Sequence, residues 1–403
     1  MNPRLKQTRT WIALLLASLV CWFLYPVIRV SVFFLVDQVG NDRNLLLTKE
    51  TIDDASGLNA VSHKGIVRLK SDLAETEKIL RETLSQARAQ NLAVVPFGAR
   101  HSLGKQALRE GALHVDTSGF NHLEMDGDLL RAQAGARWSQ VIRFLAERGL
   151  TVEVMQSNND FSIGGTLSVN AHGWQPKRPP VASTVEKFRL MLPDGSIREC
   201  SRTKEANLFR HALGGYGLFG IILDAWIRPV QNEMLQSEHR LLGTDEFIDV
   251  WNTVNKEDIR LAYARLSVAP STFFQEVLLT TYRSTGKDAL REIPEEHGGF
   301  RANLARAIFR ASLHSDRGKS FRWFIEKQIG GEASGAHPRS HLLNEPVRVF
   351  GNTDPDRTDM LMEFFVPCGR FAEFAKTAQG ILKDEAGELL NVTIRHVAND
   401  VDT

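Results

Sequence analysis

The sequence predicts an α+β protein with two mixed domains behind an apolar N-terminal segment. Its 403 residues exceed the usual size of a single domain. Short alternating runs typical of strands are interspersed with amphipathic helical patterns. From about Glu233 the pattern changes to longer strands and helices. We therefore expect one domain over residues 61–232 and a second over residues 233–403.

The charge and cysteine content exclude several classes of protein. The chain has 49 basic and 48 acidic residues and a formal charge of +1, so no global charge recruits nucleic acid. Its three cysteines, Cys21, Cys200 and Cys368, lie far apart and form no paired motif. We therefore expect neither a zinc site nor a disulfide framework, and we predict no other metal site.

Residues 1–36 predict a cytoplasmic tip followed by a transmembrane anchor. From Trp11 to Ile28 the chain has eighteen residues without a charge, which approaches the span of a bilayer core when helical. A cleaved signal peptide and a buried core helix are the competing interpretations. The run is longer than a usual signal core and lacks a convincing cleavage site, which favours the anchor. Pro26 and Arg29 predict that the helix ends near Tyr25 to Ile28.

The lipid bilayer is accordingly an expected partner. Basic residues before the apolar run favour a cytoplasmic N-terminus, which puts the rest of the chain outside. No twin-arginine pair for exporting a prefolded protein is present, so the side of the membrane stays open. Residues 37–60 are polar and mixed, which predicts a linker that lets the globular part stand away from the membrane. The basic residues that precede the apolar run are Arg4, Lys6 and Arg9.

The globular part begins with a strand, a helix and a second strand. Residues 66–69 alternate as a strand does, and Ser71 is the predicted cap of the helix that follows. Val94 and Val95 form the next strand, which Pro96 ends in a turn.

The turn after Val95 is suited to binding phosphate. Gly98 lets the backbone approach a ligand, Ser102 can donate a hydroxyl, and successive backbone N–H groups in such a turn form an anion-binding concavity. An ATP-type P-loop is not predicted, because Gly98 and Gly104 enclose five residues and Gln106 stands where a hydroxyl is required. Taken alone, the turn is equally compatible with an ordinary glycine-containing loop.

A second small and polar segment, from Ser157 to Gly173, favours a long polar cofactor. Gly164 and Gly165 permit close approach of the backbone, and the segment is rich in hydroxyl and amide side chains.

Together, these loops resemble the FAD-binding domain of the vanillyl-alcohol oxidase family, also called the PCMH-type fold. Residues 96–102 are similar to its pyrophosphate loop, residues 162–173 to its second flavin-binding loop, and residues 214–222 to the glycine-rich strand that closes the domain. The resemblance implies a two-lobed FAD-binding domain over residues 61–232, with FAD as the cofactor. It places at the cofactor Pro96, Gly98, Ala99, Arg100, His101, Ser102, Thr117, Ser157, Ser162, Gly164, Gly165, Thr166, Ser168, His172, Gly173, Gly217 and Ile222.

Within this family, the Gly-x-Arg-His-Ser form is most similar to the alditol oxidase and aldonolactone oxidase branch. There the histidine at the position of His101 is commonly joined covalently to the flavin ring. Members without that bond exist, so both forms of attachment stay open. His172 matches the His-Gly pair beside the flavin, and a structural role is its alternative.

Residues 233–403 resemble, more weakly, the α+β substrate domain that covers the flavin in this branch. Residues 363–367 and 391–397 look like two of its strands, and the resemblance implies that Arg395 lies at the substrate. Two places earlier the branch has an acidic residue, whereas this chain has Thr393, which puts simple alditols in doubt. The branch continues past the position of Thr403 and supplies a lysine near the flavin there. We therefore expect a truncated domain whose activity is in question.

A group of arginines between residues 284 and 340 predicts a solvated face, because acids and serines are interleaved with them. A second membrane contact is the alternative. The arginines are Arg301, Arg306, Arg310, Arg317, Arg322 and Arg339.

The resemblance implies an FAD-dependent oxidoreductase that acts on a hydroxyl-bearing carbon of a small molecule, either a sugar, a polyol or an aldonolactone. Hydride passes to the flavin, and oxygen or a membrane electron acceptor then reoxidises it. Two alternatives remain: a degenerate flavin-binding scaffold or partner subunit without turnover, and a membrane-tethered binding protein without cofactor. The predicted fold does not by itself indicate the substrate, because this fold hosts many reactions.

Overall fold

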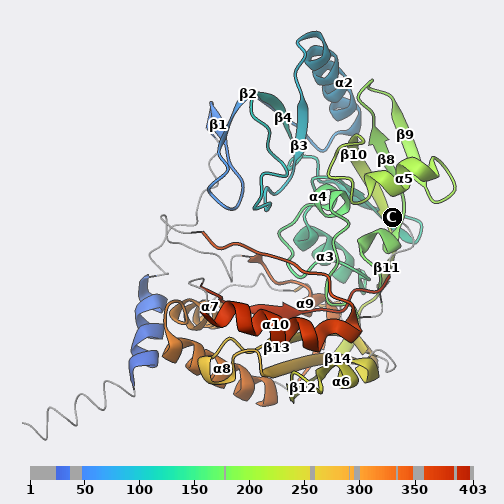
Figure 1. Cartoon of the computed structure of the whole chain (residues 1–403). Helices are drawn as coiled ribbons and strands as arrows, with labels where there is room; N and C mark the ends of the chain where they lie inside the picture. Colours follow the sequence, from blue (N-terminus) through green and yellow to red (C-terminus); the bar gives the residue numbers. More distant parts are fainter. Residues whose placement is uncertain are drawn as a thin grey trace, which may run out of the picture.

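The computed structural model describes residues 24–36, 48–176, 178–254, 259–289, 291–294, 300–332, 335–347, 358–384 and 388–399. The chain is a mixed helix and strand protein, as predicted (Figure 1). Among the described residues, three sheets use only strands that precede Asn232, and a fourth uses only strands that follow it.

The first lobe is a four-stranded sheet in the order β1-β2-β4-β3, in which β4 runs parallel to β2 and β3. Helix α2 joins β2 to β3 and packs Leu80 against Val115 of β4. Its cap is Asp72 and not Ser71 as predicted, because the Asp72 carboxylate accepts a hydrogen bond from the backbone N–H of Glu75 at 2.7 Å. The elements are β1 (Thr51–Ile52), β2 (Val61–Arg68), α2 (Leu73–Ala89), β3 (Val94–Phe97) and β4 (Ala112–Asp116).

The second lobe is a five-stranded antiparallel sheet in the order β5-β6-β10-β8-β9, with a separate β7–β11 pair. Strand β10 is buried along its whole length. Helix α3 packs Trp138 and Ile142 into the same core. The elements are β5 (Leu123–Asp126), β6 (Leu129–Gln133), α3 (Trp138–Ala146), β7 (Leu150–Val152), α4 (Ile163–Ser168), η1 (Val181–Thr184), β8 (Val185–Met191), β9 (Ile197–Ser201), α5 (Ala206–Ala212), β10 (Ile221–Ile227) and β11 (Pro229–Gln231).

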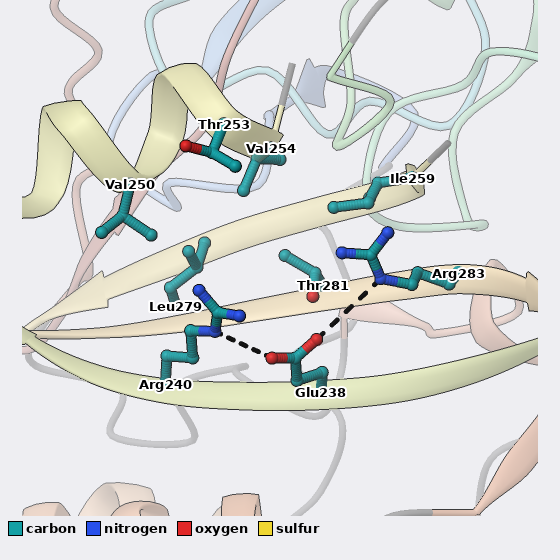
Figure 2. Close-up of a pocket in the computed structure, with 9 residues that line it drawn as sticks. All are labelled: Glu238, Arg240, Val250, Thr253, Val254, Ile259, Leu279, Thr281 and Arg283. Carbon is teal, nitrogen blue, oxygen red and sulfur yellow. Dashed lines mark hydrogen bonds and ion pairs between the residues drawn. The ribbon is translucent and has the colours of Figure 1, made fainter. Parts of the chain in front are cut away.

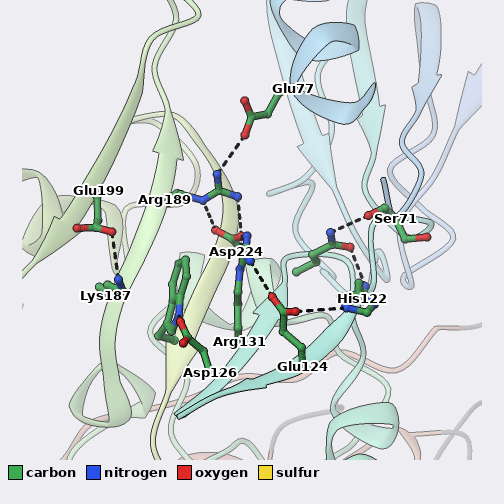
Figure 3. Close-up of polar contacts among 12 residues, drawn as sticks. Ser71, Glu77, His122, Glu124, Asp126, Arg131, Lys187, Arg189, Glu199 and Asp224 are labelled. Atoms are coloured by element: carbon green, nitrogen blue, oxygen red, sulfur yellow. Dashed lines mark hydrogen bonds and ion pairs between the residues drawn. The ribbon is translucent and has the colours of Figure 1, made fainter. Parts of the chain in front are cut away.

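A fully buried carboxylate, Asp224 of β10, ties the two lobes together (Figure 3). It accepts hydrogen bonds from Arg131 of β6 at 2.7 Å and from Arg189 of β8 at 2.6 Å. Arg189 also reaches Glu77 of α2 at 3.1 Å, so the network crosses from the second lobe to the first. Burial disfavours the Arg189 cation, but the contacts with Asp224 and Glu77 prevail and raise its pKa.

After Asn232 the chain forms a five-stranded antiparallel sheet in the order β15-β12-β14-β13-β16. Successive residues of β14 point to opposite faces: Val277 packs with α6 and α10, whereas Leu278 packs with Trp323 of α8. Helices therefore cover both faces of the sheet. The elements are β12 (Glu233–Gly243), α6 (Phe247–Val254), β13 (Ile259–Leu266), η2 (Pro270–Thr272), β14 (Glu276–Asp288), α7 (Phe300–Ala311), α8 (Asp316–Glu332), β15 (Ala336–Pro338), α9 (Arg339–Leu342), η4 (Cys368–Arg370), α10 (Phe371–Asp384) and β16 (Val392–Ile394).

Three arginines predicted on a solvated face are buried instead. The guanidinium of Arg310 pairs with Asp359, and that of Arg322 pairs with Glu326 at 3.0 Å. Arg339 donates a hydrogen bond at 2.6 Å to the backbone carbonyl of Glu153, which directly follows β7. Burial lowers the pKa of Arg339 to about 10. Arg310 and Arg339 are buried because tertiary packing supplies oxygen partners from distant segments, whereas the Glu326 partner of Arg322 lies one turn further along the same helix.

The N-terminal helix differs from the prediction in length and setting. Residues 24–36 form one helix, so it does not end near Tyr25 to Ile28. Pro26 lies in the first described turn, and Arg29 lies on the face that contacts the second domain. Within the part of the chain that the structure describes, no helix has both the length and the apolar character needed to cross a membrane. The apolar residues 11–23 lie outside the described part.

The described part of the predicted linker packs on the first lobe. Thr51 and Ile52 form β1 and pair antiparallel with β2, and Asp53 and Asp54 after them are buried.

Candidate functional site

Two of the predicted cofactor loops meet beyond the end of β3. A β-carbon on Gly98 would lie 2.7 Å from the β-carbon of Ser162 and 3.6 Å from the Thr117 hydroxyl, so only glycine permits this approach. The rings of His101 and Phe161 contact each other, with centroids 4.8 Å apart. The structure therefore brings together the first loop, the second loop and the turn at Thr117.

Residues 53–59 brace the first loop, which the sequence analysis did not foresee. The Arg100 guanidinium donates to the carbonyl of Asp53 at 3.1 Å, and the backbone N–H of Ala55 donates to the carbonyls of Arg100 and Ser102, both at 3.1 Å. Arg100 itself has a positive φ of 55°. The Asp-Asp-Ala-Ser-Gly composition of this segment is typical of tight polar turns and is the signal that could have identified it.

The third motif also reaches the first loop. Gly217 has a positive φ of 74°, and a β-carbon there would lie 3.9 Å from the ring of Pro96. In the second loop, Ser162 caps α4 by accepting a hydrogen bond from the backbone N–H of Gly165 at 3.3 Å. Two further predicted residues, Ala99 and Ser157, are half-buried in the two loops.

Other predicted residues serve the fold. The buried Thr166 hydroxyl accepts from the Trp138 indole at 2.8 Å and donates to Gln156 at 3.1 Å, so it is fully engaged. A side chain on Gly173 would collide with the carbonyl of Met155. Three more predicted residues make their contacts within the protein core or within helix α4: Gly164, Ser168 and Ile222.

The buried polar atoms at the loops that have no partner among the described residues include the Ser102 hydroxyl and Nδ1 of His172. Leaving such atoms unpaired costs about 1–3 kcal/mol each. A bound molecule with polar atoms along its length satisfies both positions, so the loops fit a ligand of the FAD type.

His101 is held in its neutral form. Burial lowers its pKa, the nearby cations Arg137 and Arg100 lower it further, and only Asp160 opposes them. A neutral imidazole keeps the lone pair that a covalent bond to the flavin requires.

A second group of residues faces these loops from the later part of the chain. Nε2 of His172 lies 2.9 Å from a carboxylate oxygen of Glu363, and the Phe365 ring meets the His172 ring edge to face at 5.7 Å. The hydrogen bond from His172 lowers the Glu363 pKa against the effect of burial, and the charge of Arg395 lowers it further. This carboxylate is therefore ionised at neutral pH.

The sequence analysis missed Glu363, which is one acid within an apolar run. Residues 363–367 were predicted to form a strand, but they have no regular secondary structure. Within the described residues no strand pairs with them, and Glu363 and Phe365 contact His172 instead.

Arg395 follows β16 and is half-buried beside this pair. The neighbouring His396 ring contacts the carbonyl of Pro176, and the N–H of Ala398 lies 3.4 Å from the carbonyl of Arg178. These contacts hold the end of β16 against the chain segment that follows the second loop. Burial lowers the Arg395 pKa, opposed by Glu363, and no ion pair or hydrogen bond joins its guanidinium to another described residue.

A hollow between α6 and the sheet of the second domain is not a comparable site (Figure 2). Its volume of about 10 Å³ holds roughly one water molecule. Its one carboxylate, Glu238, is already paired with Arg240 at 2.8 Å and Arg283 at 3.9 Å. In the described part of the chain no cluster of His, Cys, Asp or Glu can hold a metal ion.

Comparison with known proteins identifies the class. Residues 72–201 match the FAD binding domain family. Residues 72–201 are therefore a PCMH-type FAD-binding domain, and the prediction of FAD as the cofactor is confirmed. Its relatives include enzymes of the aldonolactone branch.

The chain is 26% identical to the D-arabinono-1,4-lactone oxidase of Debaryomyces hansenii over 43% of its own length and 34% of that protein. It is 28% identical to the mitochondrial L-galactono-1,4-lactone dehydrogenase 2 of Oryza sativa subsp. japonica over 42% of its own length and 29% of that protein. It is 30% identical to an uncharacterized oxidoreductase, ORF5 in the fasciation locus of Rhodococcoides fascians, over 40% of its own length and 37% of that protein. The matched part thus spans about a third of each relative.

Proposed function

We propose that the protein is an FAD-dependent oxidoreductase that oxidises a hydroxyl-bearing carbon of an aldonolactone or a related sugar. The observation that carries this proposal is the meeting of His172, Glu363 and Arg395 beside the flavin loops. The Glu363 carboxylate, and an Arg395 guanidinium that has no ion-pair partner among the described residues, suit the hydroxyl and lactone oxygens of such a substrate. The names of two relatives, a lactone oxidase and a lactone dehydrogenase, support the substrate class.

Glu363, His172 and Arg395 each have a separate role in the proposed reaction. When bound, FAD accepts the hydride that leaves the substrate carbon. Arg395 binds a substrate oxygen, and the ionised Glu363 accepts a hydrogen bond from the hydroxyl that is oxidised. His172 orients this carboxylate through its Nε2–H. The proton lost with the hydride goes to the pair of Glu363 and His172, which has access to solvent because Glu363 is about half exposed.

Membrane attachment belongs to the same proposal. The uncharged run from Trp11 to Ile28 and the basic residues before it support an N-terminal tether. A tethered enzyme has either oxygen or a membrane electron acceptor within reach to reoxidise the flavin.

Anaerobic titration of the purified flavoprotein tests the activity. L-galactono-1,4-lactone or D-arabinono-1,4-lactone is expected to bleach the visible flavin band, and dithionite serves as the positive control. Arg395→Met is expected to weaken substrate binding by roughly 10–100-fold, which corresponds to a lost hydrogen bond to a charged group. The matched control is Arg370→Met, because Arg370 is exposed and, in the part of the chain that the structure describes, forms its ion pair with its near neighbour Glu373. Bleaching by dithionite but by no lactone, sugar or polyol would favour the scaffold alternative.

A further inference from the structure

The helix of residues 24–36 is apolar on both of its faces. Its inner face packs Val30, Phe33 and Phe34 against α7, where Ala307 is fully buried. These inner residues recur at the three- and four-residue spacing of a helix stripe. The helix is therefore a packed part of the second domain, beside α7 and α8 (Figure 1).

Arg29 fixes this packing. It is the one charged residue of the segment 24–36, and its guanidinium donates to the carbonyl of Ala311 at 2.8 Å and to that of Leu313. Carbonyls at the end of a helix lack partners within that helix, so Arg29 closes the C-terminal end of α7. The only charge of the segment is thus directed into the protein.

The outer face of the same helix has no protein cover among the described residues. Its apolar side chains are between 47% and 66% exposed. Phe300 at the start of α7 extends this surface: it is 68% exposed, and its ring contacts Phe34 with centroids 5.4 Å apart. A contiguous apolar surface of this kind marks an interaction site. The outer residues are Leu24, Val27, Ile28, Val32, Leu35 and Val36.

The sequence around this surface matches a lipid partner. The uncharged run that begins at Trp11 leads directly into the helix, and no acidic residue precedes Asp37. At one edge of the surface the guanidinium of Arg317 lies 5.9 Å from the Tyr25 ring centroid. An apolar face with basic and aromatic residues at its edge is the pattern of a helix that lies in the plane of a membrane interface.

We propose that the outer face of residues 24–36, together with Phe300, is a membrane-docking face that inserts into the acyl boundary of the bilayer and holds the second domain against the membrane. This inference rests on the proposed tether and goes beyond it, because a flexible linker would let the domain stand away.

Fluorescence quenching in liposomes tests the proposal with the full chain. In a background with Cys21→Ser and Cys368→Ser, single cysteines are introduced as Val32→Cys, Leu35→Cys and Phe300→Cys and labelled with an environment-sensitive dye. The matched control is Leu58→Cys, since Leu58 is 70% exposed on the first lobe. We expect brominated acyl chains to quench the labels at all three positions and not the label at Leu58.

Position 300 is decisive, because it lies outside the N-terminal segment. Flotation of the protein with liposomes combined with an unquenched Phe300 label would overturn the docking face and leave the tether intact. Failure to float would overturn both. Protection of the labels in a dimer without lipid would assign the face to a second copy of the chain and would also overturn the proposal. None of these outcomes bears on the proposed flavin chemistry, which the anaerobic titration tests separately.

A variant provides a second measurement. Leu35→Glu puts a charge on the outer face, away from the contact with α7, and is expected to abolish quenching at position 300 while flotation and flavin content are retained. Unchanged quenching in Leu35→Glu would contradict the proposal.

Discussion

At the scale of single residues, Glu363 is the group whose role depends most on its surroundings. Its pKa is lowered by the hydrogen bond from His172, so the carboxylate stays ionised as the pH falls through the usual range of glutamate, near 4.3. We expect substrate binding to persist to that pH and to be lost below it, when the depressed pKa is passed.

Glu363→Gln keeps the size of the side chain and removes the charge. We expect kcat/KM for the lactone to fall by roughly 10–100-fold, because a hydrogen bond to a charged group is lost, and the acidic limb of the pH profile to disappear. The control is Glu373→Gln, since Glu373 is exposed and pairs with Arg370. Kinetics of Glu363→Gln that match those of the control would remove Glu363 from the site.

His101 carries the prediction about flavin attachment. Its neutral imidazole and its place beside Phe161 suit a bond to the flavin ring. If the bond exists, acid precipitation leaves the colour in the pellet of the parent protein, whereas His101→Ala releases its flavin to the supernatant. His211→Ala, a change at an exposed histidine of α5, should behave as the parent does. Equal release from the parent and His101→Ala would show that the flavin is not covalent.

At the scale of elements, the Asp224 network joins α2, β6, β8 and β10. Asp224→Asn removes the buried counter-charge of Arg131 and Arg189, which keep their partly exposed carboxylate partners, so we expect a cost of about 1–3 kcal/mol. We expect a lower urea midpoint with little change in the slope of the unfolding free energy against urea. Asp194→Asn, in the exposed turn of the β8–β9 hairpin, is the control and should shift the midpoint little. An unaltered midpoint in Asp224→Asn would mean that the network does not hold the lobes together.

At the scale of the whole molecule, the flavin loops belong to both lobes, so bound FAD links them. Because His101→Ala cannot carry a covalent flavin at this position, its FAD can be removed, and we expect the protein without flavin to have a lower Tm that rises again with added FAD. Ligand linkage predicts about 2.7 kcal/mol of stabilisation at a hundredfold excess over Kd. Differential scanning fluorimetry measures this shift, and riboflavin, which lacks the phosphates, is the matched control. A Tm independent of FAD would contradict the loop assignment.

The sequence by itself determined the features that depend on local chemistry. Glycine at position 98, hydroxyls at positions 102 and 162, and the uncharged run from Trp11 to Ile28 carry their meaning in their own side chains and spacing. The loop residues predicted a long polar cofactor, the resemblance of the two loops to a known family identified that cofactor as FAD, and the structure brings Gly98, Ser162 and Thr117 together.

Tertiary structure alone decided the pairings between distant segments. His172 and Glu363 are 191 positions apart, and Arg29 reaches the end of α7 across 282. The buried arginines 310 and 339 look solvated in the sequence because their partners come from elsewhere in the chain. The chemistry of a side chain and its spacing from its neighbours in the sequence determine which kinds of group it can bind. The packing of the segments around it determines which of those groups is its partner.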